Sequence, residues 1–91
     1  MVTNQHHTVL YIGVTSDLRN RIWEHKTKKY LNSFTTKYNC DKLVWYESFA
    51  FIEEAIAAEK RLKDRSRKYK EQLISNINPE WKDMWEEIKN W

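Results

Sequence analysis

The stretch TVLYIGVTSDLRNRIWEH, residues 8–25, predicts a strand that leads directly into a helix. Residues 9–14 are mostly β-branched, aromatic or otherwise apolar, which is typical of a buried or nearly buried strand. Ser16 is a good helix N-cap and Asp17 places an acid in the first turn. We therefore expect a helix over residues 17–29.

The rest of the chain predicts one further strand and three helices. Residues 42–49, KLVWYESF, have the β-branched and aromatic composition of a strand. Helices are expected over residues 52–64, which carry an apolar stripe, and over residues 66–77, with Ser66 as the cap. Asn78-Pro79 predicts the N-cap and first residue of a last helix. The apolar positions of that helix follow at i, i+3, i+4 and i+7: Trp81, Met84, Trp85 and Ile88.

Two strands are too few for a stable sheet. Residues 30–41, YLNSFTTKYNCD, indicate a polar and aromatic loop with a short helical turn rather than a third strand. A lone pair of strands is marginal in water without a third strand or helix cover. Either residues 1–7 contribute pairing, or a strand is missing at the front of the chain.

Length and composition favour a small cytoplasmic protein. The 91 residues suit a single domain over residues 1–91. The single cysteine, Cys40, excludes an internal disulfide and indicates a reducing compartment. Residues 1–10 do not resemble a signal peptide, and no apolar run approaches the length of a membrane span. We expect no membrane partner, and the oligomeric state is left open.

The charge is unevenly distributed along the chain. The net charge is +3, but residues 60–70 hold seven Lys or Arg and one acid, Asp64. Such a cluster favours an anionic partner, most commonly nucleic acid, although a solvated helix face fits the same pattern. The candidate nucleic-acid contacts are Lys37, Lys63, Arg65, Arg67 and Lys68.

Several side chains have spacings that suggest chemistry. Glu59 lies in an apolar stripe, where a carboxylate needs a metal ion or a salt bridge to Arg21, Arg61 or Lys63. Arg21 and His25 lie one helical turn apart and could hold a phosphate and move a proton. An exposed arginine and a helix-end histidine explain that pair equally. Tyr11 fits either a site or the core.

The motifs together resemble one known family. LYIGVTSDLRNRIWEH resembles the second half of the signature of the GIY-YIG nuclease superfamily. SFTTKY, KLVWYESF, IEEAIAAEKRLK and INPEWKDMWEEI resemble its small stand-alone bacterial members. The likeness covers about residues 3–88. It implies an α/β (α+β) fold in which helices cover a small, three-stranded antiparallel sheet.

The resemblance also implies a DNA endonuclease that uses one divalent ion, usually Mg²⁺, with Mn²⁺ as the substitute. It places Tyr11 beside the reacting centre and Arg21 on the scissile phosphate. His25 would handle the proton of the attacking water, and Glu59 would be the metal ligand. Further candidates are Gly13, the only glycine, which would leave room for a phosphate near Tyr11, and Asn78, with Asn76 competing for the same role.

One part of the family pattern has no counterpart in this sequence. Relatives begin with a strand that supplies the GIY half of the signature and a second active-site tyrosine, whereas Met1 matches the end of that strand. We therefore expect weak or no activity, or a start codon assigned too far downstream. The alternative is a non-catalytic nucleic-acid-binding module. A third reading, an interaction scaffold built on the C-terminal tryptophans, is weaker because such rings usually supply core.

Overall fold

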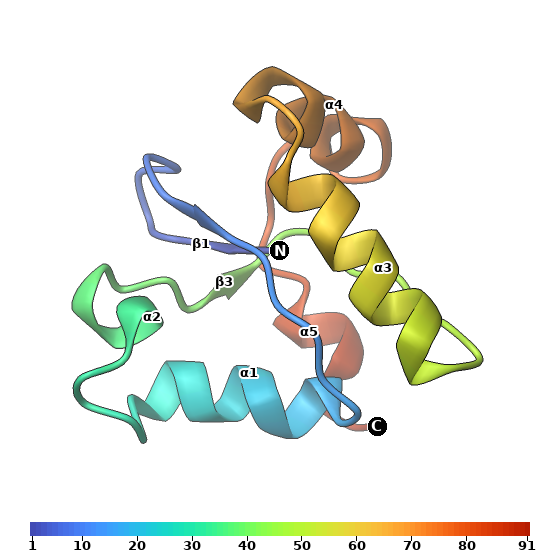
Figure 1. The fold of residues 1–91 in the computed structure, drawn as a ribbon. Coiled ribbons are helices and arrows are strands. Elements are labelled where there is room, and N and C mark those ends of the chain that lie inside the picture. Colours follow the sequence, from blue (N-terminus) through green and yellow to red (C-terminus); the bar gives the residue numbers. More distant parts are fainter.

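Three short strands and five helices make up the computed structural model, which describes residues 1–91 (Figure 1). In chain order they are β1 (Val2–Thr3), β2 (Leu10–Tyr11), α1 (Leu18–Thr27), α2 (Phe34–Lys37), β3 (Lys42–Leu43), α3 (Ile52–Lys63), α4 (Arg67–Ile77) and α5 (Trp85–Ile88). The mixed content confirms the predicted α/β (α+β) class. None of the five helices combines the length with the apolar character that a membrane span requires.

The sheet is antiparallel with the strand order β2-β1-β3. The register pairs Val2 with Tyr11 and Leu43, and Thr3 with Leu10 and Lys42. Residues 1–7 therefore do contribute pairing, and they supply the central strand. The strands predicted over residues 9–14 and 42–49 are each reduced to two residues, because β1 between them is itself only two residues long.

The start of α1 corrects the predicted cap by one residue. Asp17, not Ser16, is the N-cap, and its carboxylate accepts a hydrogen bond from the Asn20 N–H at 3.1 Å. The Asp17 N–H donates to the Thr15 hydroxyl at 3.1 Å, which closes a small turn before the helix. Asp and Ser cap about equally well, so this turn decides between two adjacent candidates.

The observed helices in the middle of the chain agree closely with those that the sequence predicts. The helical turn expected within residues 30–41 is α2, which Ser33 caps. α3 and α4 match the helices predicted over residues 52–64 and 66–77. The Ser66 hydroxyl accepts from the Tyr69 N–H at 3.2 Å, as expected of the predicted cap.

The predicted last helix is wrong over its first half. Asn78 ends α4, and its side-chain oxygen accepts from the Lys82 N–H at 3.0 Å while its amide nitrogen donates to the Lys82 carbonyl at 2.8 Å. These bonds close a turn, and Trp81 has a left-handed backbone with φ of 54°. The helix α5 begins only at Trp85. An asparagine that bonds its own downstream backbone favours a turn over a helix, and the apolar periodicity does not override it.

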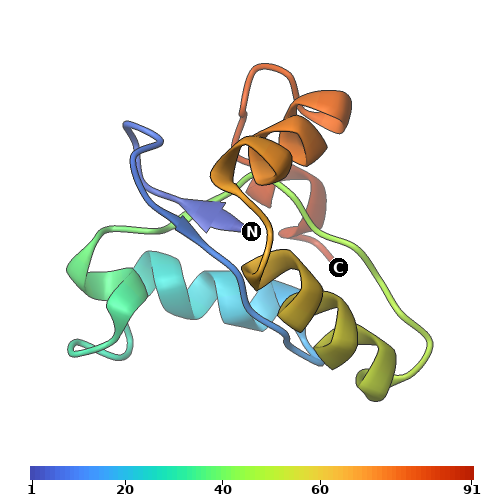
Figure 2. The same ribbon diagram turned by 45° about the horizontal axis from the view of Figure 1, so that its top comes forward.

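The core lies on both faces of the sheet. On one face, α1 and α5 pack on the strands around a buried cluster of Val2, Ile22, Cys40, Leu43 and Ile88. On the other, α4 closes a second cluster of Met1, Ile12, Val44 and Ile74, with Leu62 of α3 at its edge. Figure 1 shows α1 and α5 on the side of the strands opposite to α4, and in the turned view of Figure 2 α4 lies above the strands and α1 below them. Trp81 and Trp85 pack against these clusters as predicted, whereas Trp91 is 65% exposed.

Candidate active site

One large cavity lies beside Met1, which directly precedes the central strand β1. Its volume is about 820 Å³, and its walls come from the end of β2, the first turns of α1, the segment after β3 and one face of α3. Four candidates with predicted chemistry, Tyr11, Arg21, His25 and Glu59, all line it, and so does Gly13. Residues that lie up to 48 positions apart in the sequence are therefore gathered around one hollow.

The backbone segments on the two sides of the cavity are not paired with each other. No backbone hydrogen bond joins residues 12–16 to residues 45–50, which flank the cavity on its two sides. The last bonds of the sheet are made by Met1, whose carbonyl accepts from the Val44 N–H at 3.1 Å and whose amino group donates to the Trp45 carbonyl. Burial lowers the pKa of that amino group from 8.0 to about 5.

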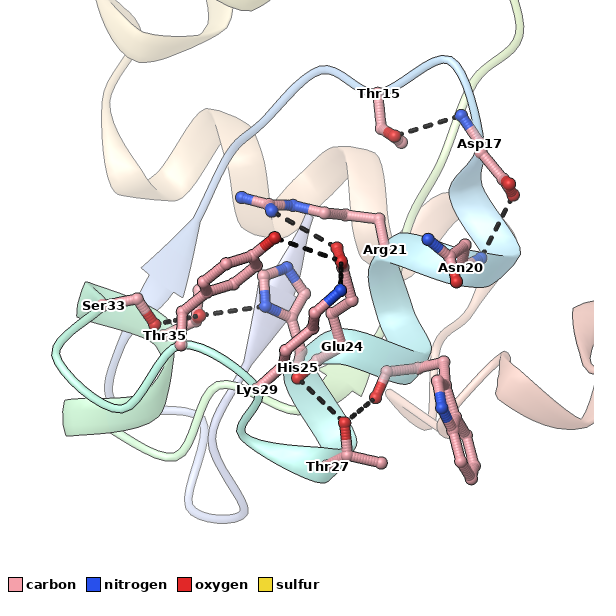
Figure 3. Close-up of polar contacts among 12 residues, drawn as sticks. Thr15, Asp17, Asn20, Arg21, Glu24, His25, Thr27, Lys29, Ser33 and Thr35 are labelled. Carbon is pink, nitrogen blue, oxygen red and sulfur yellow. Dashed lines mark hydrogen bonds and ion pairs between the residues drawn. The ribbon is translucent and has the colours of Figure 1, made fainter.

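Arg21 is held by an acid that the sequence reasoning missed. Its Nη1 lies 3.6 Å from Oε1 of Glu24, one turn further along α1 (Figure 3). Glu24 also pairs with Lys29 at 3.4 Å and accepts from the Tyr30 hydroxyl at 3.4 Å. The Arg21 side chain stays 40% exposed, so it remains accessible to a phosphate. The i, i+3 spacing of Arg21 and Glu24 was the signal that could have revealed this pair.

His25 is buried at the base of the cavity. Its Nδ1 lies 2.9 Å from the hydroxyl of Thr35, a buried residue of α2 (Figure 3). Burial, and then the nearby Arg21 charge, lower the pKa of His25 below its usual 6.5, against a smaller opposite effect of Glu24 and Asp41. His25 is therefore neutral at pH 7 and can accept a proton. No sequence pattern linked Thr35 to His25, because the contact joins two separate helices.

Gly13, two residues after the end of β2, makes room for the Tyr11 side chain. A Cβ at this position would lie 3.2 Å from Cε1 of the Tyr11 ring, closer than most real Cβ contacts. The backbone here does not have a positive φ, so conformational freedom is not the reason for glycine. The ring of Tyr11 lies across the cavity edge, with its centroid 6.4 Å from that of His25. Gly13 thus allows Tyr11 to lie beside His25.

Glu59 faces the cavity from α3, and its Oε1 lies 3.3 Å from Nζ of Lys63. The salt bridge to Lys63, one of the two explanations that the sequence left open, is therefore present. No group of three or more His, Cys, Asp or Glu side chains is placed to hold a metal ion. A single carboxylate does fit Mg²⁺, which typically binds one or two carboxylates and completes its shell with water and substrate phosphate.

The predicted nucleic-acid contacts fall into two groups. Lys63, Arg65, Arg67 and Lys68 lie on or between α3 and α4, whereas Lys37 lies on α2. Arg67 is partly committed to structure, since it donates to the carbonyls of the β1–β2 turn at His7 and Thr8 and pairs with Glu71. None of the five lines the cavity.

Asn78 does not reach the cavity. It is buried, and its amide nitrogen donates to the Val44 carbonyl at 3.1 Å in addition to closing its own turn. Asn76 is exposed on α4 and also lies outside the cavity lining. The structure therefore brings together five of the predicted site residues and leaves these two asparagines apart.

The fold and the cavity define a small α+β protein in which an arginine, a histidine, a tyrosine and a glutamate face one hollow. The GIY-YIG catalytic domain matches residues 1–72, and the chain belongs to the GIY-YIG family. A UPF0213 protein of Streptococcus pneumoniae serotype 4 (strain ATCC BAA-334 / TIGR4) is 38% identical over 65 residues, and one of strain ATCC BAA-255 / R6 is 37% identical. Each match covers 71% of this chain but only 65% of the relative. No solved structure matches significantly.

Proposed function

We propose that residues 1–91 form one GIY-YIG-like domain that hydrolyses phosphodiester bonds of DNA with the help of one divalent ion, Mg²⁺ or Mn²⁺. The observation that carries this proposal is the position of Tyr11, Arg21, His25 and Glu59 around one cavity. A protein that only bound DNA would have no use for a carboxylate facing the phosphates. The family to which the chain belongs supports the same conclusion.

Each side chain has a role that its surroundings support. Neutral His25 accepts the proton of the attacking water, because its burial favours the uncharged ring. Arg21 stabilises the negative charge that develops on the scissile phosphate, and Glu24 orients its guanidinium. The Tyr11 hydroxyl helps to position the water. Glu59 would hold the ion, which when bound polarises the phosphate and stabilises the leaving oxygen.

A second tyrosine is the missing part of this proposal. The resemblance places it on the strand that continues β1 in front of Met1, and residues 1–91 offer no equivalent there. Tyr46 also lines the cavity, but its hydroxyl donates to Glu87 at 3.5 Å, and burial together with Glu87 raises its pKa. We infer that the 91 residues alone cut slowly, by the roughly 10²–10⁴-fold loss usual for a missing acid–base group.

The second candidate function is binding of nucleic acid without cleavage. Arg21 and Glu59 are both paired, with Glu24 and Lys63, so neither charge is free in this structure. Basic side chains on α3 and α4 would still attract phosphates. DNA is the partner in both readings. The fully buried free thiol of Cys40 suits a reducing compartment, and we propose the cytoplasm as the location.

Plasmid nicking separates the two functions. Supercoiled plasmid and branched DNA are incubated with Mg²⁺ or Mn²⁺ and with the wild type, Glu59→Gln or Arg21→Ala. We expect metal-dependent nicking that both substitutions strongly reduce, and stronger nicking when a tyrosine-containing apolar strand is added before Met1. Cleavage that Glu59→Gln leaves undiminished would overturn the one-metal proposal. Salt-sensitive binding with no cleavage in any form would establish the second function instead.

A further inference from the structure

The segment between Glu24 and Asp41 is basic and aromatic. It contains no Asp or Glu, and it carries four lysines together with the rings of Tyr30, Phe34 and Tyr38. Two of the lysines are paired with acids outside the segment, Lys26 with Asp83 and Lys29 with Glu24. The proposed function uses only His25 from this segment, and Lys37 and the exposed rings have no role in it. Basic side chains interleaved with aromatic rings are typical of surfaces that bind single-stranded nucleic acid.

In the structure, four rings form a row that leaves the cavity. The centroid of Tyr11 lies 6.4 Å from that of His25 and 5.7 Å from that of Phe34, and Phe34 and Tyr11 are stacked with an angle of 29°. Tyr38 follows, with its centroid 4.7 Å from that of Phe34. The row therefore begins at the proposed proton acceptor and ends on α2 and its C-cap.

The outer two rings are exposed and lie beside a cation. Phe34 is 47% and Tyr38 is 40% exposed, whereas Tyr11 is half-buried and His25 is buried. Nζ of Lys37 lies 5.5 Å from the centroid of Tyr38. Thr35, between the two outer rings, is buried and contacts His25, so α2 has a defined position relative to the site.

We propose that Phe34 and Tyr38 form a stacking platform for an unpaired nucleobase of the DNA strand that is bound at the cavity. The proposal rests on the proposed function and deepens it, because it names DNA with a single-stranded segment as the preferred substrate class. Bases in a duplex are already stacked and cannot lie flat on these rings. The absence of acidic side chains over residues 25–40 favours a polyanion over an acidic protein as the occupant.

Binding without cleavage tests this proposal. Fluorescence anisotropy is measured in EDTA with a labelled single-stranded oligonucleotide and with the blunt duplex of the same sequence. We expect Phe34→Leu and Tyr38→Leu each to weaken binding of the single strand about tenfold, since one stacked base contributes about 1–3 kcal/mol. Binding of the duplex should change less than about twofold. Leucine keeps an apolar side chain at each of the two positions, which should preserve the fold, and thermal unfolding measures whether it does.

Two control variants isolate the ring. Phe34→Tyr keeps an aromatic face and should bind the single strand as the wild type does. Leu31→Ala removes a 77% exposed apolar side chain from the same segment without removing a ring, and it should have no effect. Equal losses for single strand and duplex, or no loss in the leucine variants, would overturn the platform. A change of oligomeric state in Tyr38→Leu, with DNA binding unchanged, would make the surface a contact between copies and would also overturn it.

The outcome is separable from the fate of the proposed function. If the platform fails while nicking still depends on Glu59, only the preference for unpaired bases is lost. If the wild type binds neither DNA in a salt-sensitive way, the DNA partner itself is excluded and both proposals fall.

Discussion

The two ends of the central strand have opposite characters. At the Thr3 end the sheet is closed: Asn4 Oδ1 accepts from the backbone of Thr8 at 2.9 Å and of Val9 at 3.2 Å, and the Thr3 hydroxyl donates to the Val9 carbonyl at 2.6 Å. Arg67 of α4 covers this turn through two further backbone bonds. At the Met1 end the segments that follow β2 and β3 diverge (Figure 1). Residues of both segments line the cavity.

The difference separates a closed, hydrogen-bonded end of the sheet from the end that holds the proposed site. The closed end satisfies its backbone polar groups with neutral side chains and one arginine. The open end holds a buried histidine, an arginine and a glutamate. These side chains suit the proposed proton transfer and phosphate binding better than they suit the packing of a core. Substitutions at the open end should therefore change activity, whereas those in the core and at the turn of Asn78 should change stability.

The largest effect is expected from Glu59→Gln, which should reduce metal-dependent nicking by about 10³-fold because a bound ion contributes several kcal/mol to the transition state. Glu71→Gln is the matched control. Both acids pair with a basic residue four positions away at 3.3 Å, but Glu71 lies outside the cavity. Both substitutions should lower the free energy of unfolding by less than about 1 kcal/mol. Equal losses of nicking in the two variants would contradict the assignment of the reaction to the cavity at the Met1 end of the sheet.

Ile74→Ala tests the packed part of the molecule. Ile74 is fully buried in the cluster below α4, and truncation should cost about 2–5 kcal/mol of unfolding free energy. Ile77→Ala on the same helix removes a side chain that is 58% exposed and should cost less than about 0.5 kcal/mol. Urea denaturation followed by circular dichroism measures both. Similar midpoints for the two variants would contradict the assigned core.

Asn78→Ala should cost about 1–3 kcal/mol of unfolding free energy, because the Val44 carbonyl and the Lys82 backbone lose their buried partner. Asn76→Ala, on the exposed face of α4, should be close to neutral. The same urea titration gives both values. A loss of nicking per folded molecule in Asn78→Ala would instead give this residue a role in the reaction.

The smallest effect is the pH dependence at His25. The pKa of His25 is lowered in the folded state, so the unfolded chain binds more protons below pH 6.5 and stability falls as the pH drops through that range. The Met1 amino group acts in the same direction between pH 8.0 and about 5. The difference between wild type and His25→Gln therefore isolates the histidine. The nicking rate should fall about tenfold per pH unit below the pKa of His25. A rate that instead rises on acidification would exclude the neutral imidazole as proton acceptor.

Local patterns in the sequence predicted the features that depend on neighbouring residues. The Ser66 cap and the bounds of α3 and α4 follow from side chains within one or two turns. The predicted last helix was wrong over its first half because a distant contact matters there. Asn78 bonds to Val44, 34 residues away, and also to the Lys82 backbone, where it closes a turn. The central position of β1 could not be derived from the pattern either, because two-residue ladders carry almost no periodicity.

The candidate site shows the same division. Arg21 and His25 share a helix face by their spacing alone, and the family signature added Tyr11 and Glu59 to them. The partner of Arg21 was readable at i+3, but the contact of Thr35 with His25 was not, because it crosses between two helices. The aromatic row from His25 to Tyr38 likewise depends on how α2 packs beside β2.

The sequence by itself determined α1, α3 and α4, the family and the choice of four candidate side chains, because these depend on short spacings and a recognisable motif. Only the tertiary structure decided that β1 lies between β2 and β3 and that Gly13 makes room for Tyr11. It also decided that a cavity joins β2, α1 and α3 where the sheet is unpaired. Strand pairing and burial are set by contacts between residues that are far apart in the chain, and no local pattern records them.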